Sequence, residues 1–333
     1  MEGKILVGHG GGGKLMHDLI EGLIREILGR ESIQLDDSAL LDTGGHTIAF
    51  TTDTFTVTPV FFPGGDIGSL AVNGTVNDLA VMGARPLFLS CALLLEEGLE
   101  IAELEKILRS MRSAAEYAGV AIVTGDTKVV PRGKADKIFI NTAGIGILEY
   151  DVQRRPIEAG DAIVISGSIG DHGIAVMAER NNLSFSKGLL SDCAPMNHLI
   201  ARVLKDHAGK IKFMRDPTRG GVASVLNEIV RGKNIGARLL EESLAIKNEV
   251  RGVCEILGID PLYTANEGKV LLVVERGYAE AVVLAMKEVP EGTGAAVIGD
   301  VTAEYPGKAY LHTAIGGNRI LPPVLDEQLP RIC

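Results

Sequence analysis

The chain has 333 residues, of which 46% are hydrophobic and 23% are charged, as is usual for a globular protein with a sizeable interior. With a net charge of −10, the chain as a whole lacks the basic footprint needed to neutralise phosphate backbones, so we expect no nucleic-acid partner. No stretch approaches the roughly 20 apolar residues of a membrane span, and the opening does not resemble a signal peptide, so we expect a cytoplasmic protein without membrane contact.

In chain order, the first half alternates helices and strands. Apolar residues at helical spacing predict a helix over residues 16–28, and two short runs around Gly44-Gly45 predict a hairpin. The pattern then predicts helices over residues 66–82 and 101–117, and strands over 86–95, 120–125 and 137–148.

The second half begins after an interruption at Arg154-Arg155-Pro156, with a strand predicted over residues 161–167. The alternation with glycine-rich turns predicts an α+β fold with α/β-like alternation. We therefore expect an N-terminal domain over residues 1–153, a C-terminal α+β domain over 154–320, and a flexible tail over 321–333. Prolines at 322, 323 and 330 favour extended backbone in the tail.

The four cysteines, at positions 91, 193, 254 and 333, lie far apart and predict neither a zinc site nor a disulfide framework. Cys91 and Cys254 lie in apolar patterns that favour burial. Cys333 is the last residue, where burial in a regular element does not explain it. An extended arm from residue 321 reaches roughly 40 Å at about 3.3 Å per residue, so the sequence suggests a thiol carried on a movable tail.

A glycine run, Gly8-His9-Gly10-Gly11-Gly12-Gly13-Lys14, resembles the phosphate-binding P-loop. The next residue is Leu15, where the P-loop needs a hydroxyl for magnesium, so a true P-loop is not expected. Two interpretations remain open: an anion cradle formed by Gly10, Gly11, Gly12 and Lys14, or a flexible leader.

Aspartates recur at turn positions in the first half, and similar junctions occur in the second. Carboxylates that converge from several elements favour a magnesium–nucleotide site, although each alone is more often a cap or turn residue. The first-half aspartates are Asp37, Asp53, Asp78 and Asp126. The second-half candidates are Asp171, His172, Asp216 and Arg219, and for His172 a structural role is the alternative. Lys128 is either a phosphate contact or an exposed lysine.

The segments DDSALL, TTDTFTVTP, VNDLAVMGARP, TGDTKVV, GSIGDHG, RDPTRGG and ANEGK together resemble an ATP-binding superfamily. This superfamily includes aminoimidazole ribonucleotide synthetase, selenophosphate synthetase and thiamine-monophosphate kinase. Within it, the opening GHGGGGKLMHDLI and the ending PRIC resemble the HypE family of hydrogenase maturation factors. The resemblance spans nearly the whole chain.

The resemblance implies a homodimer with paired N-terminal sheets, and ATP with Mg²⁺ bound near the interface. It implies metal ligation by the four first-half aspartates and nucleotide contacts by Gly10, Gly11, Gly12, Lys14, Asp53, Lys128, Asp171, His172, Asp216 and Arg219. In HypE proteins the terminal cysteine receives a carbamoyl group from HypF. ATP-dependent dehydration then gives a thiocyanate, and the cyanide passes to iron on a HypC–HypD complex.

The dehydration requires a cation for a developing oxyanion and a base near the amide nitrogen. The family positions are Lys134 and Glu267, which with Cys333 form the expected catalytic set; a surface ion pair is the alternative for the first two. Two rival functions remain, a small-molecule synthetase or kinase and a non-catalytic thiol carrier. Turnover of ATP that depends on Cys333 would separate them from the dehydratase.

Overall fold

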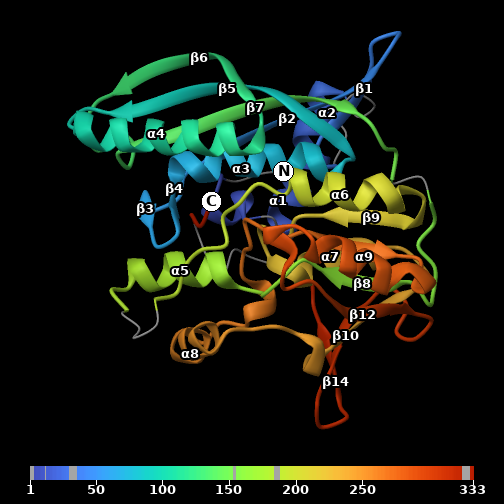
Figure 1. Ribbon diagram of the computed structural model, residues 1–333. Coiled ribbons are helices and arrows are strands. Elements are labelled where there is room, and N and C mark those ends of the chain that lie inside the picture. Colours follow the sequence, from blue (N-terminus) through green and yellow to red (C-terminus); the bar gives the residue numbers. More distant parts are fainter. Residues whose placement is uncertain (1–3, 12, 30–35, 153–154, 184–187, 325–330) are drawn as a thin grey trace.

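The computed structural model describes residues 4–11, 13–29, 36–152, 155–183, 188–324 and 331–333. The first half contains a five-stranded sheet in the order β1-β2-β7-β5-β6 (Figure 1). β5 and β6 are parallel, and the other neighbours are antiparallel. The strands are β1 (Ala39–Asp42), β2 (Thr47–Phe55), β5 (Ala84–Glu96), β6 (Ala121–Val130) and β7 (Ile138–Leu148).

Helices α3 (Ile67–Val81) and α4 (Ile101–Ala118) cover one face of this sheet (Figure 1). The Asp66 side chain begins α3 by accepting hydrogen bonds from the backbone N–H groups of Gly68 and Ser69. Every residue of α3 except Ser69 and Asp78 is buried, because the helix lies between the sheet and the second half of the chain. Asp78 is the only carboxylate of α3, and it lies toward the junction with the second half.

The other face of the sheet is open. Phe50 on β2, Ile145 on β7 and Phe88 on β5 stand in register across three strands. Their exposed fractions are 41%, 39% and 47%. Such a continuous apolar row on an open sheet is typical of a surface that another chain covers.

The second half contains a seven-stranded sheet in the order β14-β13-β10-β12-β8-β11-β9. On β8, Ala162 and Val164 belong to one apolar core and Ile163 and Ile165 to another, as the alternation of side chains along a strand requires. Its strands are β8 (Ala162–Ile165), β9 (Ile211–Arg215), β10 (Gly236–Leu240), β11 (Leu271–Val274), β12 (Ala296–Thr302), β13 (Ala309–His312) and β14 (Asn318–Leu321).

Helices pack on both faces of this second sheet. The first core contains residues of α6 and α9, and the second contains residues of α7. The helices of this half are α5 (Asp171–Arg180), α6 (Asn197–His207), α7 (Gly221–Val230), α8 (Asn248–Leu257) and α9 (Ala279–Lys287). Among the described residues, no helix is long and apolar enough to cross a bilayer.

The predicted N-terminal helix is present, with an altered middle. The smaller elements are α1 (Lys14–Leu19), a π-helical turn (Ile20–Ile24), α2 (Arg25–Leu28), and the short strands β3 (Phe61–Phe62) and β4 (Gly65–Asp66). The predicted α+β fold is confirmed. The predicted domain boundary at residue 153 falls outside the described residues.

The two halves meet at Asn77 of α3. Its Oδ1 accepts a hydrogen bond from the Met196 backbone N–H at 2.6 Å, and its Nδ2 donates to the carbonyls of Ala194 (3.2 Å) and Glu267 (3.3 Å). The end of the chain also lies at this junction, between α3 and α5 (Figure 1). The junction therefore brings residues of both halves and the terminal cysteine together.

Candidate active site

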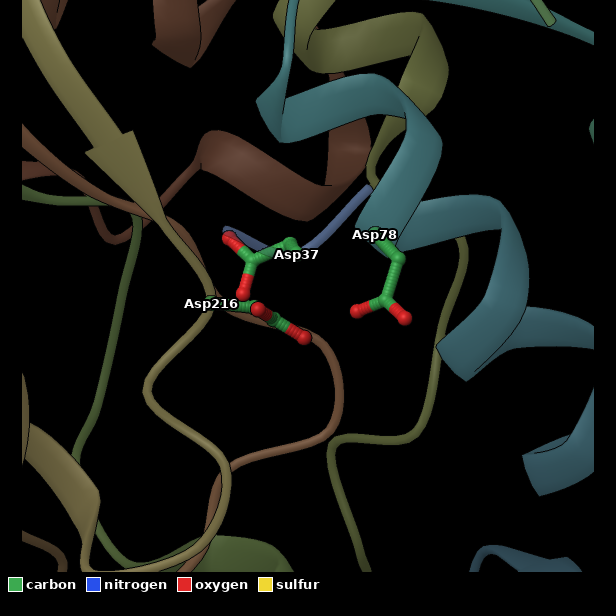
Figure 2. Close-up of side chains that lie close together, drawn as sticks. All are labelled: Asp37, Asp78 and Asp216. Atoms are coloured by element: carbon green, nitrogen blue, oxygen red, sulfur yellow. The ribbon is translucent and has the colours of Figure 1, made fainter. Parts of the chain in front are cut away.

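Three carboxylates converge where the halves meet. Asp37 precedes β1, Asp78 projects from α3, and Asp216 follows β9. Their ligand oxygens lie within 4.8 Å of one another, and Figure 2 shows the three side chains around one small space. Of the three, only Asp37 has an ion-pair partner among the described residues, with Arg215 Nε at 3.0 Å from its Oδ2.

Burial of these carboxylates has a large electrostatic cost. It raises the pKa of Asp37 to about 8 against the opposing effect of Arg215, and it raises that of Asp216 to about 6. Burial, reinforced by the charges of Asp216 and Asp37, raises the pKa of Asp78 well above its ordinary value. Clustered carboxylates with elevated pKa values fit a site for a divalent cation, since a bound cation favours their charged forms.

Three further charged side chains surround this cluster: Asp53, Glu267 and Arg219. The Glu267 side chain is 2% exposed, and its Oε1 has no hydrogen-bond partner in the described structure. Burial, then the charges of Asp216 and Asp53, raises the pKa of Glu267 well above its usual range. Arg219 opposes these negative charges, and its Nη1 donates to the Gly10 carbonyl at 3.1 Å.

The chain end is docked against the same site. Ile332 is 3% exposed and belongs to the apolar core of the first half, and Cys333 packs against that core. The negative charge of Cys333 is the largest cause of the raised pKa of Arg219, ahead of Asp53. The terminal residue therefore reaches the carboxylate site within one copy of the chain.

The structure places other predicted site residues elsewhere. Asp126 and Lys128 lie on the exposed strand β6 and form an ion pair at 2.6 Å. Lys134 lies on the exposed loop between β6 and β7, and no ion pair joins it to Glu267 in the described chain. Within one copy of the chain, Asp126 is thus not brought to the cluster of three, where Asp216 stands instead.

His172 and Asp171 both make polar contacts within the protein. His172 Nε2 lies 3.0 Å from the Ile332 carbonyl oxygen, and its Nδ1 lies 2.8 Å from Ser191 Oγ. Asp171 forms an ion pair with Lys247 at 2.7 Å. For His172 the structure thus shows contacts of the kind that the structural alternative expects. A nucleotide-binding role for either residue stays a prediction.

The glycine run forms a short 3-10 turn, Val7–Gly10, before α1. Gly12 lies outside the described residues, and Gly11 is buried at the end of the turn. Lys14 Nζ pairs with Asp18 at 2.6 Å, and the Lys14 backbone N–H donates to the Val324 carbonyl at 3.2 Å. The run therefore contacts the start of the tail and Arg219, and an anion-binding role for it stays a prediction.

Two residues that support the cluster were not predicted from the sequence. Arg215 bridges Asp37 and Glu228, and Thr51 Oγ1 lies 3.0 Å from Asp78 Oδ2. Arg215 adjoins the candidate Asp216 at the end of a strand, and this position could have indicated that it supports the site. Thr51 gave none, because a threonine in a strand is ordinary.

The chain matches the model of the AIR synthase related protein, N-terminal domain, over residues 35–148, and that of the C-terminal domain over residues 158–312. It is 46% identical to carbamoyl dehydratase HypE of Bradyrhizobium diazoefficiens over 334 residues, covering 99% of this chain and 96% of the relative.

Two solved structures share the whole architecture. A HypE–HypF complex contains a chain that is 47% identical, with a TM-score of 0.85, covering 92% of this chain and 99% of that one. HypE in complex with ATP is 46% identical, with a TM-score of 0.82, covering 99% of this chain and 100% of that one.

Proposed function

Since the chain belongs to the HypE family of carbamoyl dehydratases, within the AIR synthase superfamily, we propose that it dehydrates a carbamoyl group on its own Cys333 during hydrogenase maturation. The product is an S-cyano group on Cys333, whose cyanide passes to the iron of a nickel–iron hydrogenase. The observation that carries the proposal is the position of Cys333, which is half-buried against the apolar core of the first half and lies beside Arg219.

The reaction needs activation of a poor leaving group. The carbamoyl oxygen attacks the γ-phosphorus of ATP and ADP leaves; the nitrogen then loses its protons, the C–O bond breaks, and phosphate departs as S–C≡N forms. Glu267, buried and with an elevated pKa, is suited to accept a proton near neutral pH. Lys134 is the cation for the developing negative charge on oxygen, once its loop turns toward the tail.

ATP is the phosphoryl donor, in keeping with the solved structure of a HypE relative with ATP. Asp37, Asp53, Asp78 and Asp216 would hold Mg²⁺, which when bound offsets the charge of the triphosphate. Arg219, whose neighbours are Cys333 and several carboxylates, would keep the tail and the nucleotide phosphates in one electrostatic site. Gly10, Gly11, Gly12, Lys14 and Lys128 remain proposed nucleotide contacts.

Two partners complete the proposed sequence. HypF supplies the carbamoyl group, as the solved HypE–HypF complex suggests, and a HypC–HypD complex accepts the cyanide. The direct test is the intact mass of the protein after incubation with HypF, carbamoyl phosphate and ATP. We expect a carbamoyl adduct on Cys333 and then loss of one water that requires ATP. An adduct elsewhere, or one that ATP leaves unchanged, would contradict the mechanism.

The open face of the first sheet is the proposed homodimer surface. It carries the apolar row of Phe50, Ile145 and Phe88, and pairing would bring β6 with Asp126 and Lys128 next to a second copy. A charge at the centre of this row faces an apolar surface in the dimer and water in the monomer, so it opposes association.

We expect Ile145→Lys to weaken dimerisation by at least about 100-fold, or roughly 3 kcal/mol. Sedimentation equilibrium measures the change. Ile315→Lys is the matched control, since Ile315 is 97% exposed outside this sheet. A variant that remains as dimeric as the unmodified protein would rule out this face.

A further inference from the structure

The last three residues are held by hydrogen bonds to their main-chain oxygens. Thr58 N–H donates to the Arg331 carbonyl at 3.3 Å, and Thr56 N–H donates to the main-chain oxygen of Cys333 at 3.0 Å. The tail end therefore lies beside residues 56–58, and its backbone turns at Arg331, whose φ is 56°. The side chain of Ile332, 3% exposed, anchors it in the core between these two hydrogen bonds.

Helix α5 contacts the tail end on the side opposite residues 56–58. Arg180 Nη2 donates to the Arg331 carbonyl at 2.8 Å, and Arg180 Nε donates to the Thr58 carbonyl at 2.9 Å. Its guanidinium thus joins the tail to the segment along which the tail lies. His172, two turns earlier on the same helix, lies with its Nε2 at 3.0 Å from the Ile332 carbonyl.

The contacts of His172 define one tautomer. A carbonyl oxygen accepts only, so Nε2 carries the proton and Nδ1 accepts from Ser191 Oγ at 2.8 Å. The neutral ring suits its full burial, which lowers the pKa of His172. The main-chain oxygens of Arg331, Ile332 and Cys333 consequently each have a donor.

We propose that Arg180 and His172 are positioning residues for the reaction, and that with Thr56 and Thr58 they form a receptor that fixes the register of the chain end. A slip of one residue would turn Ile332 out of the core and move the thiol by about 3.3 Å. Misplacement of a reacting group by about 1 Å can cost 100-fold in rate. These contacts use main-chain oxygens of the tail and do not involve the Cys333 thiol.

The first test is exposure of Cys333 to iodoacetamide, followed by mass spectrometry of the intact protein and its peptides. We expect Arg180→Met to raise the alkylation rate of Cys333 by about tenfold or more, because the docked population falls when charge-assisted hydrogen bonds are lost. Arg180→Lys should restore part of the protection. Arg202→Met is the matched control, since Arg202 pairs with Asp206 and Glu288 on the second domain.

The second readout is single-turnover dehydration of the carbamoylated protein with ATP. We expect Arg180→Met to slow this step by at least about tenfold with the KM for ATP unchanged. Alkylation at the rate of the unmodified protein, or faster alkylation with unchanged dehydration, would overturn the positioning role.

If Arg180→Met does not fold, the buried Cys254 becomes accessible and is alkylated. A variant on the tail covers that case. Ile332→Asp removes the anchor by a change on the tail alone, and it must show the same faster alkylation and slower dehydration; unchanged values overturn the receptor. The inference rests on the proposed function only for the dehydration readout. If the unmodified protein never dehydrates its adduct, the function fails, while alkylation still decides whether the receptor exists.

Discussion

A Cys333→Ala variant is expected to accept no carbamoyl group and to lose all carbamoyl-dependent ATP turnover, while it still binds ATP with Mg²⁺. The reason is chemical: alanine has no nucleophile. Cys193 packs against the same apolar core as Cys333, but burial raises the pKa of its thiol to about 12, so it stays protonated and cannot replace Cys333 as the nucleophile. The other cysteines lie on β5, between α5 and α6, and in α8, and Cys254 is 4% exposed.

The measurement pairs intact mass after HypF treatment with release of phosphate. Cys254→Ala is the matched control and should keep both activities, with only the cost of a small buried side chain, about 1 kcal/mol. Turnover that persists in Cys333→Ala would favour a kinase or synthetase that acts on a free metabolite. Carbamoylation without turnover in the unmodified protein would instead favour a carrier.

An Asp78→Asn variant is expected to make the protein more stable and the enzyme inactive. Asp78 Oδ2 lies near the Thr51 hydroxyl, which an asparagine oxygen also accepts, so the local geometry is kept. The substitution removes a buried negative charge beside two others. We expect a gain of about 1 to 3 kcal/mol in the free energy of unfolding without Mg²⁺ and a loss of at least about 100-fold in turnover.

The gain should grow with pH. The folded-state pKa of Asp78 lies above its ordinary value, so its contribution to stability is complete below about pH 4 and is lost as the pH rises through the elevated value. Asparagine does not titrate, so calorimetry should show the variant gaining on the unmodified protein from pH 5 to pH 8. Saturating Mg²⁺ with ATP should reverse the order. A variant less stable than the unmodified protein at pH 8 without Mg²⁺ would contradict this electrostatic reading.

Much of the first half was predictable because its elements have clear local signals. The helix over 66–82 starts at an aspartate that caps it, and the helix over 101–117 ends at Gly119 in the left-handed conformation. The extent of β6 was underestimated, since the polar residues 126–128 carry no strand pattern and are held in the strand by pairing with β5. The local sequence gives no signal of which strands pair within a sheet.

The candidate site was only partly predictable. Asp37 and Asp78 were chosen as metal ligands from their positions after apolar runs, and the structure places them together with Asp216. Asp126 has the same local signature and lies on an exposed strand. Sequence patterns indicate that a carboxylate ends an apolar segment, but the topology decides which of these ends meet. The docking of Ile332 likewise depends on a core that residues 55–140 create.

The buried position of Ile332 at the chain end has a kinetic consequence. Because the reacting thiol is tethered to the site that transforms it, its local concentration is set by the length of chain between them and is independent of dilution. Dehydration should therefore follow first-order kinetics at any abundance of the protein. Only the encounters that load and unload the tail should slow when the proteins are scarce.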